Sequence, residues 1–107
     1  MVVPFESVGF TNPQPGVTRR IIARGGNMML VHVTFEKGTV APVHQHVHEQ
    51  LSYIVSGSFE YTMGGCTYQL KAGDSYYVVP NEVHGIRALE DSVILDIFTP
   101  QREDFLR

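Results

Sequence analysis

A histidine-rich segment near the middle of the chain has the residue types and spacing of a metal site. His44, His46 and His48 occupy alternate positions, Gln50 follows them, and His84 comes much later. On a β-strand, side chains two residues apart project from the same face, with Cα atoms about 6.6 Å apart. Two imidazoles at that separation can converge on one metal ion at bonds of about 2.1 Å. The spacing therefore predicts a metal ion bound by His44 and His46.

Gln50 can join this site only if the chain turns a corner after His46. On a straight strand, Gln50 would lie about 13 Å beyond His46, too far to share the ion. A corner at residues 47–49 leaves His44 and His46 on one strand and starts the next strand at Gln50. His84 then completes the set from a further strand.

Two alternatives stay open for this cluster. Glu49 competes with Gln50 as the fourth ligand because carboxylates are the commoner hard ligands, but it falls inside the corner with the opposite parity, which favours Gln50. The histidine-rich run is also compatible with a solvated loop that binds nothing. His32 stands alone in an alternating segment and is expected to be an ordinary surface or core residue.

Asp96 is a second candidate for chemistry because it interrupts the apolar segment 93–98. Burial of an unpaired carboxylate is costly, so Asp96 must have a partner or be neutral. One interpretation pairs it with an arginine, such as Arg102 or Arg20, and the other makes it an acid/base at the mouth of the fold. Phe98 has the same parity and is expected on the same side, either as core or as a wall of the site.

The segments that must position these residues alternate with a period of two. They are rich in β-branched and aromatic residues, and turn signals such as Gly64-Gly65 separate them. The alternating or apolar segments are 29–35, 51–55, 58–63, 75–79 and 93–98. The pattern predicts an all-β sandwich or barrel of about eight strands.

The length of 107 residues fits one domain over 1–107. We expect an irregular N-terminal arm at 1–15 and a barrel core at 28–98. Helix signals are nearly absent elsewhere, but a short C-terminal helical turn is predicted, with Thr99 as N-cap and Pro100 at the first helical position.

The composition argues against several classes of protein. A net charge of −3 gives no basic field for a nucleic acid. The apolar runs are far shorter than the roughly 20 residues of a membrane helix, and no signal peptide is visible. Cys66 is the only cysteine, which rules out an intramolecular disulfide and fits a reducing compartment. We therefore expect a cytoplasmic protein with no nucleic-acid or membrane partner.

Two segments resemble the paired motifs of the cupin family. Gly38–Gly57 is similar to the first cupin motif and Gly73–His84 to the second, and the resemblance covers essentially the whole chain. It implies a small single-domain double-stranded β-helix, or jelly-roll barrel, with one divalent metal ion in its mouth. The matching ligand positions are His44, His46, Gln50 and His84.

Gln50 and Glu82 depart from that family pattern. Gln50 stands where most cupins have glutamate, and Glu82 stands where the second motif usually has glycine, a change expected to alter only a turn. Three neutral imidazoles and a neutral amide leave the full divalent charge uncompensated, which makes a stronger Lewis acid and a better anchor for an anion. Ligand softness suits Ni, Zn, Mn or Fe about equally, so these residues do not select the metal.

The histidine segment together with Asp96–Phe105 resembles the KdgF-type cupins of pectin and alginate breakdown. Segments 16–21 and 24–29 are similar to the N-terminal strands of those proteins. The resemblance implies ring opening and tautomerisation of 4,5-unsaturated monouronates, which polysaccharide lyases release, to linear ketouronates. It also implies a homodimer.

Asp96, Phe98 and Arg102 occupy the matching positions of that family's catalytic end segment. Arg102 is expected to bind the carboxylate of the small anionic sugar in a bidentate fork. Asp96 is expected to carry a proton to carbon, and Phe98 to hold the ring and exclude water.

Other interpretations of the same residues stay open. One is a metal dioxygenase of the quercetinase type, and another is a non-catalytic cupin that binds a sugar or an anion. Arg20, together with Arg19 and Arg24, is a further candidate for binding the anionic substrate, although a solvated strand edge explains these arginines equally well.

Overall fold

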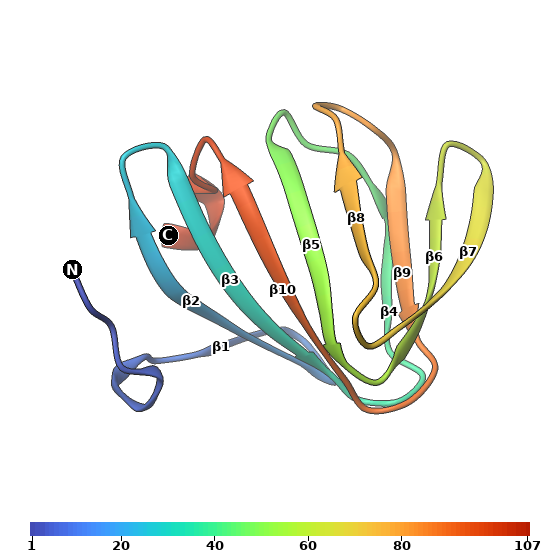
Figure 1. Cartoon of the computed structure of the whole chain (residues 1–107), viewed down its shortest axis with the longest axis horizontal. Helices are drawn as coiled ribbons and strands as arrows, with labels where there is room; N and C mark the ends of the chain where they lie inside the picture. The colour runs from blue at the N-terminus through green and yellow to red at the C-terminus, as the bar shows by residue number, and fades with distance from the viewer.

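The alternating sequence forms two antiparallel β-sheets that face one another (Figure 1). The computed structural model describes residues 1–107. The six-stranded sheet has the order β1-β2-β3-β10-β5-β8, and the four-stranded sheet has the order β4-β9-β6-β7. Strands distant in sequence are neighbours in both sheets, as in a jelly roll. The prediction of an all-β fold is confirmed.

The ten strands are short and are joined by turns. The six-stranded sheet contains β1 (Thr11–Gln14), β2 (Val17–Gly25), β3 (Met28–Phe35), β10 (Ser92–Thr99), β5 (Glu49–Ser56) and β8 (Ser75–Val78). The four-stranded sheet contains β4 (Val40–His44), β9 (His84–Ala88), β6 (Ser58–Met63) and β7 (Cys66–Lys71). Two 3-10 turns, η1 (Phe5–Ser7) and η2 (Glu103–Leu106), lie outside the sheets.

The N-terminal part of the sheet begins earlier than the sequence predicts. The arm expected to be irregular over 1–15 contains β1, which pairs with β2 at the edge of the sheet. Pro13 is tolerated there because an edge strand need not donate every ladder hydrogen bond. β2 also precedes the core boundary predicted at residue 28, and the strands number ten rather than about eight.

The C-terminal helical turn is displaced from its predicted start. Thr99 stays in β10, where it pairs with Glu49, so it does not cap a helix. The turn that follows is the 3-10 turn η2, and Arg102 is the residue that precedes it. Strand pairing has therefore overridden the local capping signal.

None of the helical segments has the length and hydropathy needed to cross a membrane.

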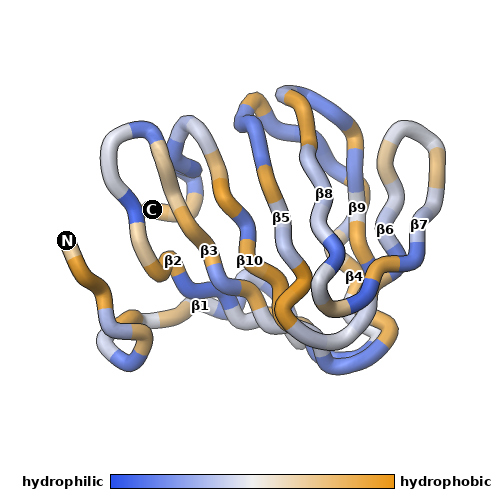
Figure 2. Tube along the Cα trace, viewed as in Figure 1, coloured by the Kyte–Doolittle hydropathy of each residue, from blue (hydrophilic) through white to orange (hydrophobic).

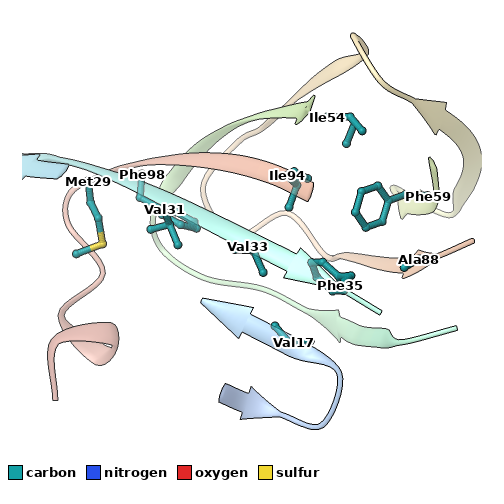
Figure 3. Packing of buried hydrophobic residues seen from close by; sticks show 10 residues of the cluster. All are labelled: Val17, Met29, Val31, Val33, Phe35, Ile54, Phe59, Ala88, Ile94 and Phe98. Carbon is teal, nitrogen blue, oxygen red and sulfur yellow. The ribbon is translucent and has the colours of Figure 1, made fainter. Parts of the chain in front are cut away.

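The core lies between the two sheets and is made by inward-facing residues of alternating strands (Figure 3). On β3, Met29, Val31, Val33 and Phe35 are all buried, while the intervening residues face outward. Phe59 from β6 meets Phe35 edge to face, with ring centroids 5.3 Å apart, and so joins the two sheets. Each fully buried side chain of this kind contributes roughly 1.5–3 kcal/mol.

The turn between β5 and β6 requires glycine. Gly57 has a φ of +83°, in the left-handed region that L side chains avoid. A Cβ atom at this position would also lie 2.6 Å from the carbonyl oxygen of Asp91 and collide with the side chain of Ser92. This tight turn carries the chain from β5 of the six-stranded sheet into β6 of the four-stranded sheet.

Candidate metal centre and substrate cavity

Three histidines meet at one end of the barrel, where the β4–β5 and β8–β9 connections lie close together (Figure 1). β4 ends at His44, and His84, which opens β9, is its direct pairing partner. His46 lies in the connection rather than on a strand, and Glu49 opens β5. The chain thus turns a corner here, and one nitrogen from each of His44, His46 and His84 lies within 4.8 Å of the others.

The same local hydrogen bond orients all three imidazoles. Nδ1 of His44 lies 2.9 Å from the carbonyl oxygen of Pro42. The corresponding Nδ1 distances are 3.0 Å from His46 to the carbonyl of His48 and 2.8 Å from His84 to the carbonyl of Glu82. A ring that donates from Nδ1 presents an unprotonated Nε2, which is the form that ligates a metal. These backbone contacts therefore prepare three ligands.

Gln50 completes the cluster from the inner face of β5. Its side chain is buried, and its Oε1 lies 2.9 Å from Nε2 of His46. Its amide group donates to Oγ of Ser52 at 2.8 Å and to Oδ1 of Asp96 at 3.3 Å, which fixes the oxygen toward the histidines. Figure 2 shows the polar start of β5 in blue, while the strand becomes apolar toward its other end.

The contact between His46 and Gln50 fits a bound cation. Both ring nitrogens of His46 face oxygen acceptors, but a neutral imidazole has only one N–H to donate. Burial lowers the pKa of His46, which disfavours the doubly protonated ring that would satisfy both. Both atoms would be satisfied as ligands of a divalent cation, which needs no proton on Nε2. The 2.9 Å that separates Nε2 from Oε1 is short enough for both atoms to bind the same ion.

Burial also keeps His84 in the neutral form. The loss of solvent lowers the pKa of His84 to about 4, with a further lowering from the neighbouring His44 and His46. The carbonyl of Glu82 acts in the opposite direction but does not offset the burial. At neutral pH the imidazole is therefore available as a metal ligand rather than as a cation.

Glu49, His32 and His48 are not among the groups whose ligand atoms converge, although the ring of His48 lies 5.5 Å from that of His46. The carboxylate of Glu49 accepts hydrogen bonds from the hydroxyl of Tyr77 and, at 3.4 Å, from that of Thr99. His48 packs edge-on to Phe98, with ring centroids 6.3 Å apart, and His32 packs against Phe5. The geometry accordingly brings Gln50, and not Glu49, to the three histidines.

Asp96 lies beside the cluster on the inner face of β10. Its Oδ1 accepts a 2.6 Å hydrogen bond from the hydroxyl of Ser52 as well as the bond from Gln50. No arginine forms an ion pair with it, contrary to one of the two interpretations of this residue. Burial raises the pKa of Asp96 to about 6, although the hydrogen bonds from Ser52 and Gln50 and the charge of Arg102 lower it. The pKa of Asp96 therefore lies closer to neutral pH than that of a solvent-exposed aspartate.

Phe98 and Arg102 face the same space as Asp96. The ring of Phe98 meets that of His46 edge to face at 5.7 Å, and Cζ of Arg102 lies 4.9 Å from the centroid of Phe98. The guanidinium of Arg102 already holds Asp104, through Nε to Oδ1 at 3.1 Å and Nη2 to Oδ2 at 2.9 Å. The guanidinium of Arg102, which was predicted to bind a substrate carboxylate, is thus partly occupied by the side chain of Asp104.

The arginines of β2 divide between the two faces of the sheet. Arg19 has the inward parity of Val17 and lines the cavity. Arg20, predicted to bind substrate, projects from the opposite face, where its Cζ lies 5.3 Å from the ring of Phe5 and 5.2 Å from that of Phe10. Arg24 donates to the side chain of Gln101 at 3.1 Å. The prediction for Arg20 is therefore corrected, because strand alternation points it away from the site.

A cavity of about 270 Å³ joins these groups. This volume is slightly below the range of about 300–1,000 Å³ that is typical of small-molecule sites, which fits a ligand of monosaccharide size rather than a polymer. The polar and aromatic lining includes His44, Gln50, His84, Asp96, Phe98 and Arg102.

Two residues of this site, Ser52 and Phe105, were not selected from the sequence as functional, and Arg19 was selected only as one of three candidate arginines. Ser52 has the parity of Gln50 and so could have been placed inside, but a serine in a strand carries little signal by itself. Phe105 lies in η2, and its ring meets that of Phe98 edge to face at 5.7 Å. Arg19 shares the parity of Val17, which was the available indication that it faces inward.

Comparison with known proteins agrees with this geometry. Residues 31–98 match the family described as Cupin domain, which is more than half of the chain. The "Pectin degradation protein KdgF" of Dickeya dadantii is 42% identical over 105 residues, covering 96% of this chain and 91% of that protein.

Two solved structures support the same relationship. KdgF from Halomonas sp. superimposes with a TM-score of 0.93 at 34% identity, covering 98% of this chain and 99% of that one. An RmlC-like cupin from Shewanella frigidimarina superimposes with a TM-score of 0.90 at 35% identity, covering 94% of this chain and 91% of that one.

Proposed function

The chain belongs to the cupin family, and from that premise we propose that it opens the ring of 4,5-unsaturated monouronates to give linear ketouronates. One observation carries the proposal: the carboxyl of Asp96 adjoins the histidine cluster in a cavity of monosaccharide size and is hydrogen-bonded to Gln50. The similarity to proteins named KdgF, one of them a pectin degradation protein, supports the choice of substrate.

His44, His46 and His84, with Gln50 as the fourth ligand, would hold one divalent ion. The donor set of three imidazoles and an amide oxygen fits Ni, Zn, Mn or Fe. When bound, such an ion supplies a Lewis acid that polarises a substrate oxygen. Gln50 would also have a second role. Its amide group donates a hydrogen bond to Asp96 and so connects the metal ligands to the carboxyl that would move the proton.

Asp96 would move the proton that the reaction needs. Opening the hemiacetal breaks the bond between the ring oxygen and carbon 1, and the hydroxyl proton at carbon 1 leaves as the aldehyde forms. The ring oxygen becomes an enol hydroxyl at carbon 5, and a proton added to carbon 4 converts the enol to the ketone. No atom is gained or lost overall, so one carboxyl can both accept and donate. The raised pKa of Asp96 suits this exchange.

Phe98 and Arg102 would hold the substrate. The ring of Phe98 forms an apolar wall beside His46, against which a sugar ring can pack while water is excluded. Arg102 donates to Asp104 through Nε and Nη2, so its Nη1 group keeps its donors for the substrate carboxylate.

We also propose a homodimer in the cytoplasm. β5 and the neighbouring β8 present an apolar strip on the outer face of the sheet, made by Leu51, Tyr53, Val55 and Tyr77, each between 43% and 51% exposed. A strip of this kind is suited to burial against its own copy across a two-fold axis. Light scattering should give twice the 12.0 kDa of one chain, and a monomeric mass would contradict the dimer.

The proposed location in the cytoplasm is supported by the unpaired Cys66, which fits a reducing compartment.

The test of the function follows the ultraviolet absorbance of the ring double bond in a lyase digest that contains unsaturated monouronates. The protein should remove this absorbance faster than buffer does, lose that ability after chelation and regain it when a divalent metal is returned. A rate equal to buffer with metal bound would refute the proposal. Oxygen uptake with a polyphenol would then point to a dioxygenase, and saturable sugar binding without turnover to a binding protein.

A further inference from the structure

Arg19 lies inside the barrel, in the cavity that holds the proposed reaction. Its Cα pairs with that of Val33, a core residue, and its neighbours Val17 and Ile21 face the same way. The cavity includes Arg19 together with Arg102, although the two come from opposite ends of the sequence. The cavity therefore contains two arginines, whereas the proposed substrate has a single carboxylate for them to bind.

The two arginines differ in what they already bind. Arg102 is bonded to Asp104 through two of its nitrogens, and its side chain is only 12% exposed. The side chain of Arg19 forms no ion pair and no hydrogen bond. All five N–H groups of its guanidinium therefore remain to be satisfied by water or a ligand. Arg19 is thus the arginine whose planar fork can take both oxygens of a carboxylate.

Phe105 holds the two guanidinium groups close to one another. Cζ of Arg19 lies 3.7 Å from the centroid of Phe105, and Cζ of Arg102 lies 4.2 Å from it. Asp104 is the only carboxylate bonded to either arginine. Arg19, Arg102 and Asp104 together therefore carry one uncompensated positive charge. A monocarboxylate sugar would neutralise that charge.

The surroundings of Arg19 favour a negative ligand. Burial lowers the pKa of Arg19, Asp104 raises it, and the neighbouring charge of Arg102 lowers it. A guanidinium that has lost part of its hydration without gaining a carboxylate partner gains more from binding an anion than a fully solvated one.

We propose that Arg19 binds the carboxylate of the substrate through its guanidinium fork and thereby sets the KM of the enzyme. The inference rests on the proposed function for the identity of the substrate. It assigns to Arg19 the bidentate contact that the family resemblance gives to Arg102, and it leaves Arg102 with a single free Nη1 group at the same carboxylate.

The test compares Arg19→Met with Arg20→Met. The two arginines are adjacent in β2 and both stack on phenylalanine rings, but Arg20 lies on the outer face of the sheet. Loss of a charge-assisted fork should raise KM for the unsaturated monouronate by about 10- to 100-fold, with kcat within about threefold of wild type. Arg20→Met should leave both constants unchanged.

A binding measurement separates this inference from the proposed reaction. Calorimetry with D-galacturonate, a saturated sugar acid, should show about 10- to 100-fold weaker binding in Arg19→Met than in wild type. Neither D-galactose, which has no carboxylate, nor the variant Arg20→Met should show this difference. Arg19→Lys keeps the charge and the contact with Phe105 but loses the fork, so its affinity should fall between those of wild type and Arg19→Met.

The outcomes distinguish the two proposals. Turnover by wild type with an unchanged KM and unchanged galacturonate affinity in Arg19→Met would overturn the role of Arg19 and leave the function intact. A fall in kcat alone would also overturn it, because it would show that Arg19 acts on the chemistry or the fold. If wild type has no turnover, the proposed function fails, and galacturonate binding alone decides whether Arg19 binds a carboxylate.

Discussion

The mouth and the floor of the barrel are built from the same strands, yet they have opposite properties. β5 carries Gln50 and Ser52 at the mouth and Ile54 in the floor, and β9 carries His84 at the mouth and Ala88 in the floor. The floor is sealed by tight apolar packing around Phe59. The same alternation points all these side chains inward, so the fold sets their direction, and the residue types at one end set the chemistry.

The largest predicted effect at the mouth is the loss of turnover on replacing Asp96. Asp96→Asn keeps an oxygen that can accept from Ser52 and Gln50 but cannot give a carboxyl proton to carbon. We expect turnover to fall about 10²- to 10⁴-fold while metal content stays at the wild-type level. Turnover is measured by loss of ring absorbance and metal content by elemental analysis. Full activity in this variant would remove the acid/base role.

The matched change in the floor should reverse this pattern. Phe59→Ala leaves a cavity where the two sheets meet and should lower the free energy of unfolding by about 3–5 kcal/mol. Chemical denaturation of the metal-loaded protein measures that loss. The part of the sample that stays folded should retain its turnover, since Phe59 does not line the cavity. A specific loss of activity in fully folded protein would mean that mouth and floor are not separable.

A more conservative change at the mouth is Gln50→Glu. The added negative charge should tighten metal binding about tenfold or more, but the new carboxylate cannot donate to Asp96. Two facing carboxylates would raise the pKa of Asp96 and disturb its hydrogen bonds, so turnover should fall about tenfold. Metal titration against a competing chelator and the absorbance assay measure the two effects. Weaker metal binding would show that residue 50 is not a ligand.

The last prediction concerns the dependence of folding stability on pH in metal-free protein. The pKa of Asp96 is about 6 in the folded chain and near its ordinary 3.8 in the unfolded chain. The unfolded state therefore releases this proton first as pH rises, and folding stability falls from about pH 4 until the folded carboxyl has ionised above about pH 6.

Asp96→Asn removes this penalty. A pKa difference of about two units corresponds to roughly 3 kcal/mol, so the Tm of this variant relative to wild type should rise by about 10 °C or more between pH 4 and pH 7.5. Thermal unfolding of chelated samples measures the difference. A constant difference in Tm across this range would mean that Asp96 ionises alike in both states.

The floor and the corner of the metal cluster could be predicted from the sequence because both depend on strand parity. The histidine spacing required a corner before Gln50, and the parity of Asp96 and Phe98 placed both on one face. These inferences use only the period of two and the reach of a side chain. The roles of the same residues remain proposals.

The features that could not be predicted depend on contacts between segments, such as strand pairing, which a local sequence pattern does not specify. In β2, Arg19 and Arg20 were both candidates for binding the anionic substrate, and the pairing of β2 with β3 and the packing of the N-terminal arm leave Arg20 on the outer face of the sheet. The pairing of Thr99 with Glu49 kept a capping residue in a strand. The ion pair between Arg102 and Asp104 depends on the path of the chain after β10.

The most direct test of the account identifies the product by NMR, with metal-loaded protein and an unsaturated monouronate in deuterated water. The expected product is an open-chain ketouronate that carries solvent deuterium at carbon 4 and forms faster than in buffer. Persistence of the unsaturated ring at the rate seen in buffer, with metal bound to the protein, would contradict the assignment of the barrel mouth as the catalyst.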